Sequence, residues 1–163
     1  MKRLLLDAIK GLARTAEIWG DALILGIVVS IVLVLMTIGI HFEFLRRMPG
    51  IADSFGLRPR LRILIVMVGA FAAHTIEIYM FALGYRLLDA IYPPQLFDGV
   101  FAGTFADYLY FSAASYTSLG VGDIWPLGPV RVISGTEALT GLIMIAWTAS
   151  FTYLMMGRYW RND

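Results

Sequence analysis

The chain has 163 residues, of which 59% are hydrophobic and 15% are charged. Soluble domains carry about 25% charged residues, so this composition indicates an integral membrane protein of one domain. Cysteine is absent, from which we expect no disulfide, no zinc site and no thiol chemistry. The net charge of +1 is too balanced to indicate a nucleic acid partner, and nothing in the sequence indicates a soluble partner.

Residues 1–19 are predicted to form an amphipathic helix at the membrane interface. Leu5, Ile9 and Leu12 recur at helical spacing, which places apolar side chains on one face. Asp7 and Lys10 interrupt the apolar run, so the segment is not predicted to be a signal peptide.

Three stretches are apolar and long, over about 22–44, 63–83 and 132–156. Each approaches or exceeds the roughly 20 residues needed to cross a hydrocarbon core. We predict an extra transmembrane helix and a basic cytoplasmic loop over 20–60. Residues 61–163 are predicted to form one module, with an outer helix over 61–88 and an inner helix over 130–156.

The distribution of arginine predicts the orientation, because loops rich in Lys and Arg stay in the cytoplasm. The loop between the first two apolar stretches has five arginines, whereas the long connection before the third has only Arg86 and Arg131. We therefore expect this loop and the C-terminus in the cytoplasm, the long connection outside, and the protein in a bacterial inner membrane. Three crossings then place the N-terminus outside, where its four basic residues are unexpected.

The long connection contains a shorter apolar segment. Residues 105–116, FADYLYFSAASY, lack Gly and Pro and are too short to span a bilayer. A helix over 104–116 followed by the irregular run TSLGVGD indicates a re-entrant segment. Non-helical backbone at membrane depth is tolerated only where it lines a water-filled cavity or is buried in protein.

This order of helix, re-entrant helix, TSLGVGD and helix resembles the pore module of the potassium channel superfamily, over about residues 61–156. In the family signature Thr-X-Gly-Tyr-Gly-Asp, Ser118 falls on the Thr, Val121 on the aromatic residue and Asp123 on the acid. Gly120 and Gly122 fall on the two glycines. The resemblance implies two transmembrane helices with a pore helix and a selectivity filter over 117–123 between them. With the apolar stretch over 22–44, which lies outside the resemblance, we expect an all-α integral membrane fold with three transmembrane helices. The resemblance also implies a homotetramer, because four chains close the ring of ion ligands.

The resemblance implies a role for each of these positions. A potassium ion needs oxygen ligands in place of its hydration shell, and backbone carbonyls supply them. Glycine takes the left-handed backbone that aligned carbonyls require. Asp123 is expected at the outer mouth, hydrogen-bonded to Tyr110 of the pore helix. The expected ion-binding residues, of which the first five hold K+, are Thr117, Ser118, Leu119, Gly120, Val121 and Gly122.

Two departures from the signature bear on selectivity. Val121 lacks the phenol and much of the volume of Tyr, and Ser118 lacks the methyl group that stiffens Thr. Both changes predict a softer filter. We expect conduction of monovalent cations, either K+ alone or K+ together with Na+.

Four residues within the apolar segments are further candidates. Gly141 is a candidate gating hinge, with close helix packing as the alternative. His74 and Glu77 share one helical face and form a candidate intramembrane polar pair. A pH-sensitive role for this pair is weighed against an interhelical hydrogen bond to the first helix or the pore helix, and we favour the second. Glu137 is predicted to support the filter by bracing Asp123 or Thr117.

The sequence therefore predicts a tetrameric, potassium-conducting channel that works by passive transport, without cofactor, catalytic residue or enzymatic activity. Its expected partners are its own copies and membrane lipid. The first alternative is a non-selective or sodium- or calcium-permeable channel of the same fold. Intramembrane aspartyl proteases carry Gly-X-Gly-Asp, as residues 120–123 do, but need a second Asp on another membrane helix. The first two apolar stretches contain no Asp. A membrane protein without transport activity is the remaining alternative.

Overall fold

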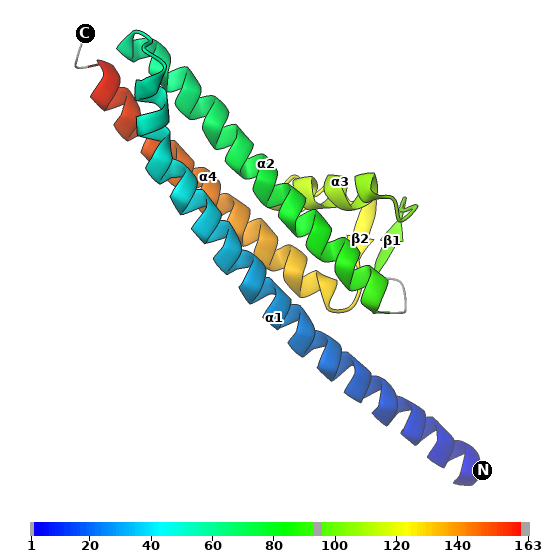
Figure 1. The fold of residues 1–163 in the computed structure, drawn as a ribbon. Coiled ribbons are helices and arrows are strands. Elements are labelled where there is room, and N and C mark those ends of the chain that lie inside the picture. Colours follow the sequence, from blue (N-terminus) through cyan, green and yellow to red (C-terminus); the bar gives the residue numbers. More distant parts are fainter. Residues whose placement is uncertain (1, 93–95, 161–163) are drawn as a thin grey trace.

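The structure is a computed structural model that describes residues 2–92 and 96–160, with side chains described at position 20 and from 23 onward. The elements in chain order are α1 (Lys2–Ser54), α2 (Pro59–Ile91), β1 (Phe97–Gly99), α3 (Phe105–Tyr116), β2 (Ile124–Pro126) and α4 (Val130–Trp160). The three long helices lie side by side, and α3 packs against α2 and α4 together with the two strands (Figure 1).

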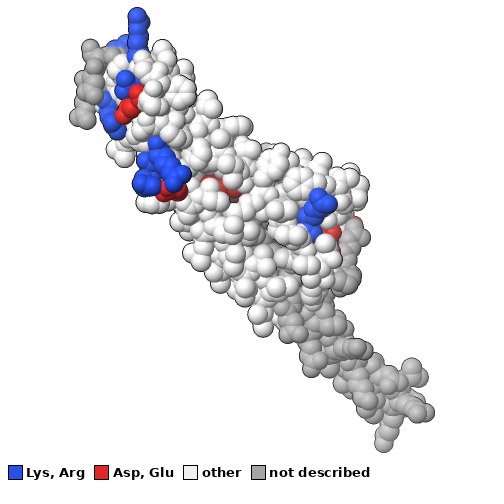
Figure 2. Space-filling model, in the orientation of Figure 1, with Lys and Arg blue, Asp and Glu red and all other residues white. Residues whose placement is uncertain are grey.

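Three helices are long and apolar enough to cross a membrane, over Leu23–Ser54, Pro59–Ile91 and Val130–Trp160. On the face shown in Figure 2, charged side chains gather mainly at the end that carries the α1–α2 turn and the C-terminal end of α4. Large apolar side chains are exposed between the ends, among them Val68, Phe71 and Tyr153 at 70%, 75% and 76%. The predicted class, a helical integral membrane protein with three membrane helices and a shorter fourth helix, is confirmed.

Helix α1 differs from the prediction of a separate N-terminal helix. Its backbone runs without a break from Lys2 to Ser54 and passes through Pro49, so it also takes up part of the predicted loop. Arg46 and Arg47 lie on this helix, where both pair with Glu43 at 2.6 and 2.5 Å. The interfacial location of residues 1–19 stays a prediction, and their side chains lie outside the described residues.

The two strands were not predicted. They pair antiparallel, with Asp98 opposite Trp125. Each strand has three residues, which is too few to show an alternation of apolar and polar side chains. Strand β1 precedes α3 and strand β2 follows TSLGVGD. Their pairing therefore holds together the two ends of the stretch that contains α3 and TSLGVGD.

A buried aromatic cluster fixes α3 and the strands on the long helices. The ring of Phe97 packs edge-to-face on Tyr85, Tyr108 and Phe111, with centroids 5.7, 5.5 and 5.1 Å away. Such pairs stabilise beyond the apolar area they bury. Near this end α1 also approaches α4, since a Cβ atom on Gly26 would lie 2.9 Å from the carbonyl oxygen of Pro129.

Candidate functional site

Helix α3 begins at a capping box. The Thr104 hydroxyl accepts from the Asp107 amide at 3.3 Å, and the Asp107 carboxylate accepts from the amides of Thr104 and Ala102 at 2.9 and 3.1 Å. The amide hydrogen bonds, led by that of Thr104, lower the pKa of Asp107. The helix start is thereby fixed by local chemistry.

The middle of α3 is held by Glu137 of α4, which is fully buried. The Ser112 hydroxyl lies 2.5 Å from one Glu137 oxygen and 2.8 Å from the carbonyl oxygen of Ile78, and the Tyr85 hydroxyl donates to the other Glu137 oxygen. The prediction that Glu137 braces Asp123 or Thr117 is therefore wrong in its partners. Glu137 joins α4 to the pore helix and to α2, and supports the filter segment only through α3.

The TSLGVGD segment has left-handed backbone at every second residue. The φ angles are 56° at Ser118, 58° at Gly120 and 82° at Gly122. Alternation between left- and right-handed conformations is the backbone geometry that turns successive carbonyls to the same side, as rings of carbonyl ligands require. Glycine adopts such angles without steric cost, whereas Ser118 is the only described residue other than glycine that has a positive φ.

The carbonyl groups of this segment accept no backbone hydrogen bond within the described part of the chain. Among the backbone hydrogen bonds of the described residues, none ends on a carbonyl oxygen of residues 117–122. The amides of Leu119 and Gly120 instead donate to the carbonyl oxygen of Ala114, at 2.9 and 3.4 Å. The Thr117 hydroxyl donates to the Ala113 carbonyl at 2.7 Å. The segment is thus tied to α3 through its donors, and its carbonyl acceptors stay available.

Asp123 is held from two sides at the end of the segment. The Tyr110 hydroxyl lies 3.0 and 3.1 Å from the two carboxylate oxygens of Asp123, which is the contact that the sequence predicted. Loss of hydration and the Asp123 carboxylate raise the pKa of Tyr110, which keeps this phenol a donor. The carbonyl oxygen of Asp123 accepts from the amide of Val100 at 2.8 Å.

Gly141 is a packing position. A Cβ atom there would lie 1.9 Å from the carbonyl oxygen of Tyr116, the last residue of α3. The structure therefore supports close packing of α4 on the pore helix, and a hinge at Gly141 stays a prediction.

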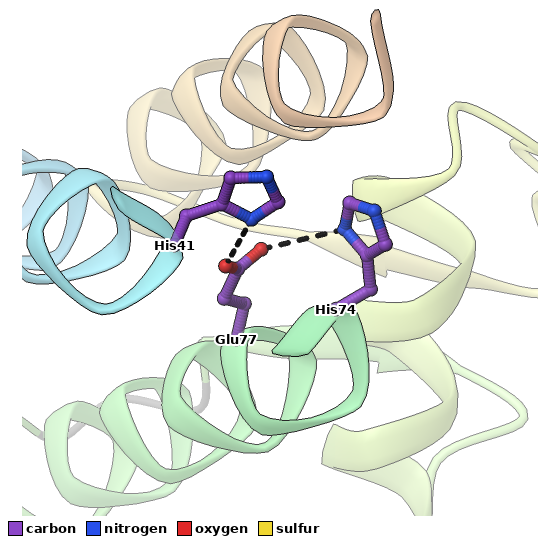
Figure 3. A group of neighbouring side chains, drawn as sticks. All are labelled: His41, His74 and Glu77. Atoms are coloured by element: carbon purple, nitrogen blue, oxygen red, sulfur yellow. Dashed lines mark hydrogen bonds and ion pairs between the residues drawn. The ribbon is translucent and has the colours of Figure 1, made fainter. Parts of the chain in front are cut away.

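His74 and Glu77 belong to a larger cluster, which includes His41 of α1 (Figure 3). His41 Nδ1 lies 2.8 Å from one oxygen of Glu77, and His74 Nδ1 lies 3.5 Å from the other. Tyr116 of the pore helix donates to Glu77. The structure thus has the interhelical hydrogen bonds that we favoured for this pair, to His41 of α1 and to Tyr116 of α3.

Several residues of the site were not recognised in the sequence. His41 is not among the residues that the sequence singled out, yet its side chain is fully buried. The sequence signal that could have identified it is its position inside an apolar run, because an ionisable group within a membrane segment is a candidate functional residue. Nothing in the local pattern singled out the remaining partners, Tyr85, Val100, Ser112 and Tyr116.

Residues 63–157 match a protein family described as ion channel. Because the match covers more than half of the chain and includes α3, the TSLGVGD segment and nearly all of α2 and α4, the chain belongs to this ion channel family. No curated protein and no solved structure matches the chain.

Proposed function

We propose that the chain is the subunit of a homotetrameric cation channel that conducts potassium passively through the carbonyl groups of residues 117–122. The observation that carries this proposal is the left-handed backbone at Ser118, Gly120 and Gly122, together with carbonyl oxygens that no donor in the described chain occupies. One chain supplies one such segment, and four around an axis provide rings of oxygen ligands.

The surroundings of the segment agree with this role. Helix α3 ends at Tyr116, directly before the proposed filter. The partial negative charge of its C-terminal end would therefore stabilise a cation at the inner end of the filter. Asp123 adds a carboxylate at the other end. In this proposal the filter mouth faces outward across a bacterial inner membrane, the C-terminus is cytoplasmic, and the chain is not an enzyme.

A channel that also passes sodium is the second candidate, and Val121 favours it. A cavity of about 390 Å³ borders Val121, Tyr110 and Ala138. An aromatic residue at position 121 would take up part of that space and stiffen the filter. With Val, less side chain packs behind the carbonyl rings, so the rings are less restrained and can contract around a smaller ion.

The reversal potential of the purified protein in a planar bilayer, with K+ on one side and Na+ on the other, tests both candidates. We expect reversal close to the potassium equilibrium potential. Reversal near zero would establish the second candidate in place of the first. Gly120→Ala is the matched control, because its φ of 58° strains any residue with a Cβ atom. Current that is absent from the wild type, or unchanged by Gly120→Ala, would contradict conduction through this filter.

A further inference from the structure

All four helices meet at a cluster of polar side chains that the ion pathway does not use. We propose that this cluster binds one divalent transition metal ion, with His41 of α1 and His74 and Glu77 of α2 as ligands. The proposal stands on the geometry of these residues and does not rest on the channel function.

The ligand atoms already converge. Figure 3 shows the two imidazole rings and the carboxylate pointing toward one another, from α1 and α2. One ligand atom from each residue lies within 4.8 Å of the others, and His41 and Glu77 are fully buried. The His–Glu separations are 2.8 and 3.5 Å. Ligands bound to zinc at about 2.0–2.1 Å in a tetrahedron lie about 3.3 Å apart, so small side-chain shifts suffice.

A second shell of hydrogen bonds orients both rings. The hydroxyl of Thr148 on α4 lies 2.9 Å from His74 Nε2 and 3.1 Å from His41 Nε2. When both Nδ1 atoms bind a metal, both rings carry their proton on Nε2, and a hydroxyl oxygen has two acceptor positions to receive them. Thr136 and Thr140 of the same helix donate to carbonyls of their own helix, whereas the Thr148 contacts in the described chain go to the two histidines.

Tyr116 is placed to be the fourth ligand. Its hydroxyl oxygen lies 2.9 Å from His74 Nδ1 and donates to Glu77. A dication inside a membrane protein needs nearby negative charge, because uncompensated charge in an apolar interior is costly. Glu77 with the phenolate of Tyr116 neutralises two positive charges. The set is then two nitrogens and two oxygens, which suits tetrahedral coordination.

The donor set defines the class of ion. Imidazole binds Zn²⁺, Fe²⁺, Co²⁺, Ni²⁺ and Cu²⁺ well, whereas Mg²⁺ and Ca²⁺ prefer oxygen ligands alone. The absence of cysteine, from which no zinc site was expected, removes thiolate ligands but leaves imidazole and carboxylate ones. We therefore assign the site to borderline transition dications, with Zn²⁺ as the reference ion.

The competing occupant is a proton. Without a metal, His41 Nδ1 lies 2.8 Å from Glu77, the Tyr116 hydroxyl donates to Glu77, and His74 Nδ1 lies 2.9 Å from the Tyr116 hydroxyl. A metal binds the deprotonated form of its ligands, so metal binding displaces protons from this network and releases them.

Metal binding can be measured directly on the untagged full-length protein, purified in lipid nanodiscs and freed of metal with a chelator. We expect equilibrium dialysis against Zn²⁺ to give one ion per chain, with release of protons into weakly buffered solution. Co²⁺ is expected to show the visible absorption of a four-coordinate site. The ring of Trp147 lies 5.3 Å from that of His41, so bound Co²⁺ should quench its fluorescence, and Trp147→Phe should remove that signal while keeping the stoichiometry.

Variants separate this site from chance binding. Glu77→Gln and His41→Gln should abolish stoichiometric Zn²⁺ binding, and Thr148→Val, which keeps the side-chain shape, should weaken it about 10–100-fold. Glu43→Gln is the control, because Glu43 lies two residues from His41, is partly exposed and should leave binding unchanged. The proposal would be overturned if the wild-type protein bound no Zn²⁺, or if binding survived equally in Glu77→Gln and Thr148→Val. The cluster would then be a hydrogen-bonded network without a metal.

Discussion

Val121 is 53% exposed in the single chain and borders a cavity beside the filter. We expect Val121→Tyr to place an aromatic ring in that space and, in the proposed tetramer, to add one hydrogen bond behind the carbonyl rings. Since such a bond contributes about 0.5–1.5 kcal/mol, the permeability ratio of K+ to Na+ should rise by up to roughly tenfold. Bi-ionic reversal potentials measure this ratio. Leu119→Ile serves as the control at the variable position, and an equal rise there would contradict the argument.

Gly141 defines how closely the inner helix approaches the end of the pore helix. Gly141→Ala forces a shift of the Tyr116 carbonyl, which we expect to destabilise the folded protein by about 1–3 kcal/mol. The thermal denaturation midpoint of the assembled protein measures this loss. Gly39→Ala is the matched control, because a Cβ atom there meets nothing within 4 Å. It should be neutral or stabilising by about 0.5–1 kcal/mol, and equal destabilisation of both variants would be inconsistent with a close contact at Gly141.

At the scale of the element, the stability of the first turn of the pore helix is expected to depend on pH. Because amide hydrogen bonds hold the pKa of Asp107 below its usual value, its ionised form contributes stability above the unfolded pKa, near 3.9. That contribution is lost as the pH falls through the lower, folded-state pKa. We expect Asp107→Asn to lower the denaturation midpoint at pH 7 and to have less effect toward pH 3. A difference between the two proteins that stayed constant over this range would argue against the capping carboxylate.

The helices also show which structural features the sequence patterns can predict. The sequence indicated the outer, pore and inner helices because each has a distinctive length and apolarity, and TSLGVGD marked the segment that is proposed as the filter. Which face of a helix meets which neighbour is not in those patterns. Glu137 was therefore assigned the wrong partners, and His41 was not connected to Glu77, which lies 36 positions further along the chain. These contacts depend on how α1 packs against α2 and how α4 packs against α2 and α3.

At the scale of the whole molecule, the chain's lack of cysteine permits a clean test of orientation. Ser54 at the end of α1 and Asp98 in β1 are both exposed, and they lie at opposite ends of the membrane helices. We expect a membrane-impermeant maleimide added to intact cells to label Asp98→Cys and not Ser54→Cys. Inside-out vesicles should give the reverse, with the unsubstituted protein as the blank. The opposite pattern would invert the proposed topology.

The unbroken course of α1 has a mechanical consequence. A helix of 53 residues, at 1.5 Å each, is about 80 Å long, whereas a hydrocarbon core is about 30 Å thick. In Figure 1 its amino-terminal part continues well past the other helices. Gly26 lies against Pro129, just before α4 begins, and His41 further along the same unbroken helix contacts Glu77 of α2. A displacement of the projecting part would therefore be transmitted along one continuous helix to the side chain of His41.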